Sequence, residues 1–194
     1  MQRDVSLLVS RNVSLGLILE EDLAILHKWR NDTDFLAFCS NRRFLLSFEE
    51  FKAEFQKDFE NDRHLQMTIK LKSTGDLIGT VYYYGLKGVD GFVFITIFLE
   101  RTYRRKGYGA EAVALFAKHL FSKFNILKIY LDVYEYNLDS LYIMQKANFS
   151  EEGRFLKQRK FGGQRYDVFR FAIYKEDIKR FKKLFSFFQR NKGG

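Results

Sequence analysis

The most informative run of residues in this chain is Phe98-Leu99-Glu100-Arg101-Thr102-Tyr103-Arg104-Arg105-Lys106-Gly107-Tyr108-Gly109-Ala110. It joins an apolar strand pattern to an amphipathic helical pattern through a turn whose two glycines can adopt unusual backbone dihedral angles. A helix that starts at such a turn presents unpaired N–H groups and the positive end of its dipole, which together bind phosphate well. Arg104, Arg105 and Lys106 add positive charge at the same place, so the pattern predicts a ligand with more than one phosphate charge, such as a pyrophosphate.

The glycine pattern is a weak signal when it is taken alone, because Gly-x-Gly beside basic residues is common in surface loops. It lacks the Gly-Lys-Ser/Thr of a Walker loop and is not a complete dinucleotide-binding fingerprint. Its place between a strand and a helix is what favours ligand binding.

Strand and helix patterns alternate on both sides of this run. Strand patterns occupy residues 13–19, 65–71, 77–84, 92–99, 128–134, 149–159 and 165–173. Helical patterns occupy residues 20–29, 48–59, 139–146 and 175–190, and a further helix starts at the glycine turn. No repeat or linker divides the chain, so we expect a single domain over residues 1–194 with its core at about 13–174. The order predicts an α/β (α+β) fold with a mixed, mostly antiparallel sheet of six to seven strands flanked by helices.

The segment at 175–190 carries an apolar stripe with lysines and arginines around it. A basic amphipathic helix of this kind can lie on an anionic membrane. More often it covers a sheet edge or a subunit contact, and packing is the interpretation that we favour.

Composition limits the classes of protein to consider. The 194 residues are 46% hydrophobic and 29% charged, and they contain no apolar run of about 18 residues, the length that a membrane span requires. The first residues show no signal-peptide pattern, and the single cysteine, Cys39, rules out an intramolecular disulfide framework. We therefore expect a soluble protein in a reducing, cytoplasmic setting. The net charge of +9 favours anionic partners such as nucleic acid, an anionic membrane or a phosphorylated cofactor.

Four motifs occur in one order along the chain. They are Glu21-Asp22-Leu23 with Trp29-Arg30-Asn31-Asp32; Arg104-Arg105-Lys106-Gly107-Tyr108-Gly109; Asn137-Leu138-Asp139-Ser140 followed by Gln145-Lys146-Ala147-Asn148-Phe149; and Glu152-Gly153-Arg154 with Tyr166-Asp167. The second resembles the Gln/Arg-x-x-Gly-x-Gly/Ala signature of the GCN5-related N-acetyltransferase (GNAT) superfamily. The third is similar to that family's Asn-x-x-Ser and Glu-Lys-x-Gly-Phe, and the first and fourth resemble its branch that acetylates ribosomal-protein N-termini.

The resemblance implies the GNAT fold, whose sheet splays between the strands at 92–99 and 128–134 and leaves a V-shaped opening for a thioester. It implies acetyl-CoA as the cofactor, with loop amides on the pyrophosphate, Asn137 on the pantetheine arm, and backbone pairing between that arm and the strand before the loop. The implied cofactor-binding residues are Ile97, Phe98, Leu99, Arg104, Arg105, Lys106, Gly107, Tyr108, Gly109, Ala110, Asn137 and Ser140.

The catalytic residues are less regular. Many relatives carry a glutamate in the strand before the loop and a tyrosine after the motif asparagine, and these positions here are Phe94 and Met144. The resemblance makes Ser140 the candidate proton donor for the departing thiolate, with a helix N-cap as its alternative role. Glu152 and Asp167 are candidate bases for the amine, with surface ion pairs as their alternative role. A chain of waters is a further candidate for the base.

No metal site is expected, because His27, His64 and His119 show no ligand spacing. Cys39 has no accompanying histidine pattern that would activate it as a nucleophile, so we expect a small buried residue there.

The predicted function is an N-acetyltransferase that moves an acetyl group from acetyl-CoA to a primary amine by direct attack in a ternary complex. The acceptor stays open between a ribosomal-protein-type N-terminus, a nucleotide-linked amino sugar, a polyamine and an aminoglycoside, and the net positive charge favours anionic or phosphate-bearing acceptors. An acyl-CoA binding protein without turnover and a nucleic-acid-binding domain are alternatives from other classes. We expect a monomer or homodimer without a membrane span and without direct nucleic-acid binding.

Overall fold

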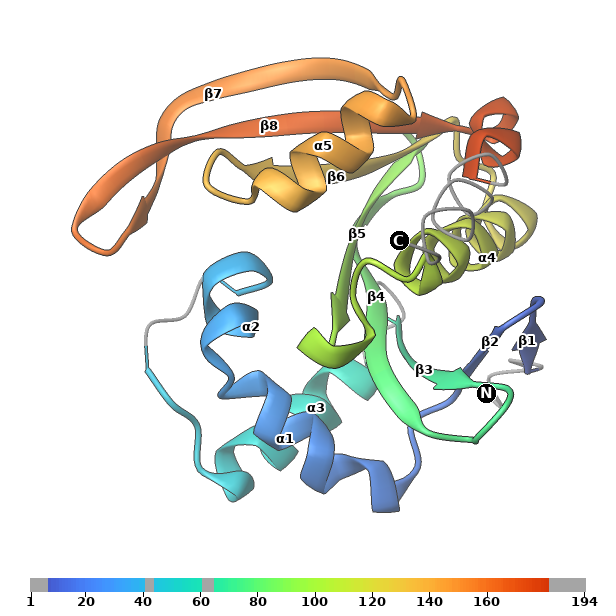
Figure 1. Cartoon of the computed structure of the whole chain (residues 1–194), viewed down its shortest axis with the longest axis vertical. Helices are drawn as coiled ribbons and strands as arrows, with labels where there is room; N and C mark the ends of the chain where they lie inside the picture. The colour runs from blue at the N-terminus through green and yellow to red at the C-terminus, as the bar shows by residue number, and fades with distance from the viewer. Residues whose placement is uncertain (1–6, 41–43, 61–64, 182–194) are drawn as a thin grey trace, which may run out of the picture.

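A computed structural model describes residues 7–40, 44–60 and 65–181 of the chain, and within it one eight-stranded sheet runs in the order β1-β2-β3-β4-β5-β6-β8-β7 (Figure 1). The strands are β1 (Leu8–Val9), β2 (Val13–Gly16), β3 (Leu65–Leu71), β4 (Leu77–Lys87), β5 (Phe92–Leu99), β6 (Lys128–Tyr134), β7 (Ser150–Phe161) and β8 (Gln164–Tyr174). Neighbouring strands are antiparallel except β5 and β6, which are parallel. The mixed, mostly antiparallel sheet is confirmed, and the two-residue β1 accounts for the eighth strand.

Besides a further helix that begins at residue 178, five α-helices and three short 3-10 helices lie within the described residues. They are η1 (Glu20–Asp22), α1 (Leu23–Arg30), α2 (Thr33–Phe38), α3 (Phe48–Glu60), η2 (Arg101–Tyr103), α4 (Tyr108–Lys123), α5 (Leu138–Lys146) and η3 (Lys175–Asp177). The expected capping box starts α3, where Ser47 Oγ accepts from the Glu50 N–H at 3.2 Å and Glu50 Oε2 accepts from the Ser47 N–H at 2.8 Å. Helix α2 was not expected; the Asp32 carboxylate caps it by accepting from the N–H of Asp34.

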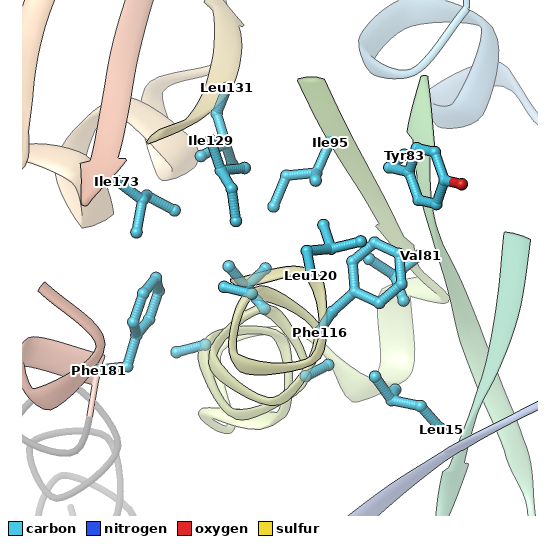
Figure 2. Packing of buried hydrophobic residues seen from close by; sticks show 14 of the residues in the cluster. Leu15, Val81, Tyr83, Ile95, Phe116, Leu120, Ile129, Leu131, Ile173 and Phe181 are labelled. Carbon is cyan, nitrogen blue, oxygen red and sulfur yellow. The ribbon is translucent and has the colours of Figure 1, made fainter. Parts of the chain in front are cut away.

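Helix α4 fills one face of the sheet (Figure 2). Its Phe116 and Leu120 are fully buried among strand residues such as Val81, Ile95 and Ile129. Alternation along β5 sends Val93 and Ile95 to this face, so the even-numbered residues of the same strand point to the other one.

Helices α1, α2 and α3 cover that other face, on the side of β4 and β5 opposite α4 (Figure 1). Trp29 of α1, Phe35 of α2 and Phe51 of α3 form a second buried cluster with Phe98 of β5. Thr96, which lies two positions before Phe98 on β5, therefore points toward the space between these helices and the rest of the sheet.

The sheet divides at its only parallel pair among the described strands. Strands β5 and β6 pair at Phe92 with Lys128, Val93 with Ile129 and Phe94 with Tyr130, and the pairing ends there. Beyond this point β5 continues beside β4, while β6 continues beside β8. The V-shaped opening that the resemblance implied is present.

The chain turns into a helix again after β8. Phe181 is buried, and its ring centroid lies 4.9 Å from that of Phe149. This first part packs against the domain, whereas the remainder of the segment expected at 175–190 lies outside the described residues. None of the helices in the described ranges is long and apolar enough to cross a bilayer.

Candidate active site

The glycine turn after β5 leads directly into the N-terminus of α4. Gly107 caps the helix with a φ of 84°, in the left-handed region that favours glycine, and Arg105 adopts a φ of 59°. The first intrahelical bond of this turn runs from the Glu111 N–H to the Gly107 carbonyl, so the N–H groups of Gly109 and Ala110 precede the helical hydrogen bonds. A Cβ on Gly109 would lie 3.2 Å from Leu99 Cδ1, which leaves little room for a side chain. These features fit a pyrophosphate at the helix terminus.

The basic side chains of the turn have partners within the protein. Arg104 donates to the Leu99 carbonyl at 2.8 Å and to Asp34 Oδ2 at 2.6 Å. Arg105 donates to Asp139 Oδ1 at 2.6 Å. Because carboxylates offset the charge of both arginines, a pyrophosphate here would depend mainly on the backbone N–H groups and the helix dipole.

Helix α5 starts at the same end of the opening, after β6. Asn137 is its N-cap, and its Oδ1 accepts from the Ser140 N–H at 3.2 Å. The capping role considered for Ser140 therefore belongs to Asn137, and Ser140 lies half-buried in the first turn. The ion pair between Arg105 and Asp139 connects the two sides of the opening, so the structure brings the expected cofactor-binding residues to one place.

A cavity of about 1030 Å³ lies on the other face of the sheet, between α1, α2 and the β7–β8 hairpin. Its lining residues are Arg30, Thr33, Leu36, Phe38, Cys39, Ser40, Gln66, Tyr82, Tyr84, Thr96, Asp132, Tyr134, Gln158, Arg159, Lys160, Phe161, Gly162, Gly163, Arg165 and Val168.

The cavity meets the opening between the strands. Thr96 of β5 and Asp132 and Tyr134 of β6 line it, and all three follow the last paired residues, Phe94 and Tyr130. Every second residue of β5 beyond Phe94 directs its N–H and C=O away from β4 and toward this gap. A thioester held in the gap would therefore face the cavity, with backbone N–H groups beside its carbonyl oxygen.

The hydroxyl and thiol groups of the cavity wall are protonated at neutral pH. Burial raises the pKa of Tyr134 to about 12 and that of Cys39 to about 12, and it also raises the pKa values of Tyr82 and Tyr84. Cys39 donates to the Ile97 carbonyl at 3.5 Å, which agrees with a structural role for its thiol. The only carboxylate in the described wall, Asp132, accepts two hydrogen bonds from Arg170, at 2.7 and 2.8 Å.

Glu152 lies outside the cavity wall, near the start of β6. It accepts hydrogen bonds from Lys128 at 2.5 Å, from Tyr130 at 2.8 Å and from the Tyr174 hydroxyl. Burial alone would raise the pKa of Glu152, but the hydrogen bonds from Lys128, Tyr174 and Tyr130 outweigh it and lower that pKa. The surroundings of Glu152 therefore fit the alternative role considered for it, that of an ion-pair partner.

Asp167 is also outside the cavity wall, because its neighbour Val168 takes the inward position on β8. Its carboxylate accepts from the Lys157 N–H and from Arg154 Nε, both at 2.8 Å, and these two bonds lower its pKa. In the part of the chain that the structure describes, neither the Glu152 nor the Asp167 carboxylate is hydrogen-bonded to Ser140.

Sequence reasoning missed Thr96, Asp132 and Tyr134. Strand alternation placed them on one face with Phe94, but nothing in the sequence showed that α1, α2 and a hairpin would enclose a space over them. Phe94 itself packs in the paired part of the sheet, where its ring centroid lies 4.7 Å from the guanidinium carbon of Arg170.

A sheet that splays beside a helix terminus suited to a phosphate group, and that opens onto a cavity, is the arrangement of an acyl-CoA-dependent N-acetyltransferase. The family model described as acetyltransferase (GNAT) domain matches residues 13–150. The chain belongs to this family. Among the residues that the structure describes, no group of three or more His, Cys, Asp or Glu side chains is arranged to hold a metal ion.

Two curated relatives are similar to this chain. The chain is 32% identical to the probable N-acetyltransferase YjcK of Bacillus subtilis over 111 residues, which are 57% of this chain and 61% of that protein. It is 22% identical to spermidine N(1)-acetyltransferase of Escherichia coli over 165 residues, 85% of this chain and 87% of that one.

Solved structures share the fold. Spermidine N-acetyltransferase from Vibrio cholerae, in complex with CoA and spermine, superposes with a TM-score of 0.78 at 20% identity over 86% of this chain and 98% of that one. The ribosomal L7/L12 α-N-protein acetyltransferase RimL, in complex with coenzyme A, gives a TM-score of 0.76 at 15% identity over 87% of this chain and 98% of that one.

Proposed function

We propose that this protein transfers an acetyl group from acetyl-CoA to a primary amine that enters the cavity of about 1030 Å³. The observation that carries the proposal is the meeting of this cavity with the gap between β5 and β6, at Thr96, Asp132 and Tyr134. Cofactor and acceptor would approach from opposite faces of the sheet and react in a ternary complex. Holding both in one geometry converts a bimolecular reaction into an effectively unimolecular step.

In the reaction the amine nitrogen forms a bond to the thioester carbon, the carbon–sulfur bond breaks, and the amine loses a proton while the thiolate gains one. The Ser140 hydroxyl, in the first turn of α5, remains our candidate for protonating the thiolate. The ion pairs of Glu152 and Asp167 outside the cavity support a structural role for both carboxylates, so we assign the role of base to water.

On the cofactor side, the N–H groups at the start of α4 would hold the pyrophosphate. The edge of β5 at Ile97–Leu99 would pair with the pantetheine arm through its N–H groups, because the carbonyls of Ile97 and Leu99 already accept from Cys39 and Arg104. Asn137, whose Oδ1 caps α5, would offer its amide N–H groups to the same arm. A cytoplasmic location stays a prediction from the sequence.

Relatives act on spermidine and on a ribosomal protein N-terminus, so family membership alone leaves the acceptor open. Calorimetry with acetyl-CoA, followed by measurement of thiol release with a panel of amines, tests the proposal. We expect saturable binding and release of CoA thiol that requires an amine. A folded protein that shows no binding would overturn the assignment, and binding without turnover for every amine would identify an acyl-CoA binding protein instead.

A further inference from the structure

The cavity wall is strongly basic. Arg30, Arg159, Lys160 and Arg165 line it, and Asp132 is the single carboxylate among the lining residues in the described ranges. Arg170, which is not part of the wall, already holds Asp132 through two hydrogen bonds. The acceptor side of the site therefore has a positive potential that attracts anions and repels polycations.

Two of these cations occupy directly opposed positions. Lys160 of β7 pairs in register with Arg165 of β8, beside the turn at Gly162 and Gly163. Like charges opposite each other on neighbouring strands destabilise a hairpin. A bound anion would relieve this repulsion, so the placement is understandable if the hairpin end holds a negatively charged group.

Arg159 is held on the side of β7 that faces α2, whereas its neighbour Lys160 alternates to the other side of the hairpin. The Arg159 guanidinium donates to the carbonyls of Leu36, Ala37 and Ser40 and to the Tyr136 hydroxyl, at 2.7 to 3.2 Å. Carbonyl and hydroxyl oxygens orient the guanidinium without removing its formal charge. Its charge therefore adds to the positive potential of the cavity from a fixed position.

The wall does not suit the acceptors of the spermidine acetyltransferases among the relatives. A polyamine with several ammonium groups needs carboxylates around it, and the lining offers one that already has a partner. The similarity of fold to those enzymes therefore does not extend to the charge that an acceptor would meet here.

We propose that the acceptor is a small molecule that carries both a primary amine and a phosphate group. This inference rests on the proposed acetyltransferase function and specifies its substrate. The phosphate lies against Lys160 and Arg165, where the hairpin end lines the cavity, and the amine points inward to Thr96 and Asp132, where the gap delivers the thioester. A volume of about 1030 Å³ accommodates a sugar phosphate or a nucleotide-linked amino sugar.

Binding to protein that is saturated with CoA tests the anion site, because CoA then occupies the pyrophosphate loop. The probes are glucosamine 6-phosphate against glucosamine, and phosphoethanolamine against ethanolamine, measured by calorimetry and by thiol release with acetyl-CoA. We expect the phosphorylated member of at least one pair to bind about tenfold more tightly and to react faster. Equal or better binding of the unphosphorylated member in both pairs overturns the proposal.

Charge reversal provides the variant test. We expect Lys160→Glu with Arg165→Glu to reduce binding of the preferred phosphorylated amine at least tenfold while the KM for acetyl-CoA stays unchanged. The control pair Lys87→Glu with Lys118→Glu makes the same change of net charge at exposed positions outside the cavity and is expected to leave binding unchanged. An equal loss of binding in both double variants would mean that net charge causes the effect, and it would overturn the proposed local site.

Two further outcomes separate the possible failures. Faster acetylation of an acidic tetrapeptide than of any phosphorylated amine would assign the basic wall to a protein N-terminus, and preference for spermidine would remove the anionic acceptor altogether. The absence of thiol release with every amine, in folded protein that binds acetyl-CoA, would instead contradict the acetyltransferase function itself.

Discussion

Arg104 of the glycine turn and Asp34 of helix α2 form an ion pair at 2.6 Å, although 70 residues separate them in sequence. The same guanidinium donates to the Leu99 carbonyl at the end of β5. Because Thr33 and Leu36 of α2 line the acceptor cavity, this pair joins the proposed cofactor loop to the wall of the acceptor site.

Replacing Asp34 with Asn should therefore raise the KM values for acetyl-CoA and for the acceptor together. The pair is only partly exposed, and its loss should cost about 1 kcal/mol of folding free energy, a few degrees in Tm. Arg101→Ala is the matched control, because Arg101 pairs with the same carboxylate from a side chain that is 80% exposed. An effect on one KM alone would contradict the coupling.

The pH dependence of stability checks the same pair. Burial alone would raise the pKa of Asp34, but the neighbouring Arg104 and Arg101 outweigh it and lower that pKa below 3.8. A lowered carboxyl pKa stabilises the folded state above the unfolded pKa, and the stabilisation is lost as the pH falls through the folded pKa. The difference in Tm between the wild type and Asp34→Asn should thus be largest near neutral pH and shrink below about pH 4.

Gly107→Ala tests the helix terminus. An alanine at a φ of 84° costs about 1–2 kcal/mol, and the turn can relieve this strain only by moving the N–H groups that would hold the pyrophosphate. We expect the Kd for CoA to rise about tenfold, with a smaller change of kcat at saturating acetyl-CoA. Gly88→Ala is the control, since no atom lies within 4 Å of a Cβ there and its φ is not in the left-handed region. Unchanged CoA affinity in folded Gly107→Ala would show that the phosphates bind elsewhere.

Most of this framework was accessible from the sequence. Periodicity located β3, β5 and β6 to the residue, and the Ser47 capping pattern located the start of α3. The opening in the sheet followed from the resemblance and is present. These features depend on local backbone preferences and on burial patterns that repeat along one segment.

The acceptor site was not accessible in the same way. It depends on contacts between distant segments, such as Arg159 with the carbonyl of Ser40, 119 residues earlier in the chain. The short helix α2 has no periodicity of its own to predict it. Glu152 looked like a base because of its motif, but its hydrogen bonds with Lys128 and Tyr174 form only when β6, β7 and β8 align.

Asp139→Asn tests how the arginines of the turn respond to the cofactor. Asp139 pairs with Arg105 across the opening, and it places a negative charge where an anionic cofactor would enter. Removing that charge frees Arg105 to face the phosphates, so we expect the Kd for acetyl-CoA to fall a few-fold and its salt dependence to become steeper. Weaker binding in this variant would mean that the ion pair itself positions the loop.

Glu152→Gln distinguishes a structural carboxylate from a base. The lowered pKa of Glu152 means that its carboxylate stabilises the folded state above pH 4.5, and that this contribution is lost as the pH falls through the folded pKa. We therefore expect a lower Tm for Glu152→Gln at neutral pH, a difference that narrows in acid, and a kcat within about threefold of the wild type. A fall of kcat by a hundredfold or more, with loss of a limb from the pH profile, would restore Glu152 as the base.

The pH dependence of the reaction follows from the pKa values of the cavity wall. Among the described wall residues whose pKa is shifted, none has a pKa near 7 that would suit a general base. Burial keeps Tyr134 and Cys39 protonated, each with a pKa raised to about 12, so neither accepts a proton from the amine near pH 7. If water takes that proton, the rate depends on the fraction of acceptor that is already neutral. We expect kcat/KM to rise about tenfold per pH unit and to level off only at the pKa of the acceptor amine, so that acceptors of lower amine pKa reach the plateau earlier. A plateau near pH 7 that stays in place when the acceptor is changed would instead reveal a protein group as the base, and the cavity carboxylate Asp132, which Arg170 holds at 2.7 Å, would be the first to replace.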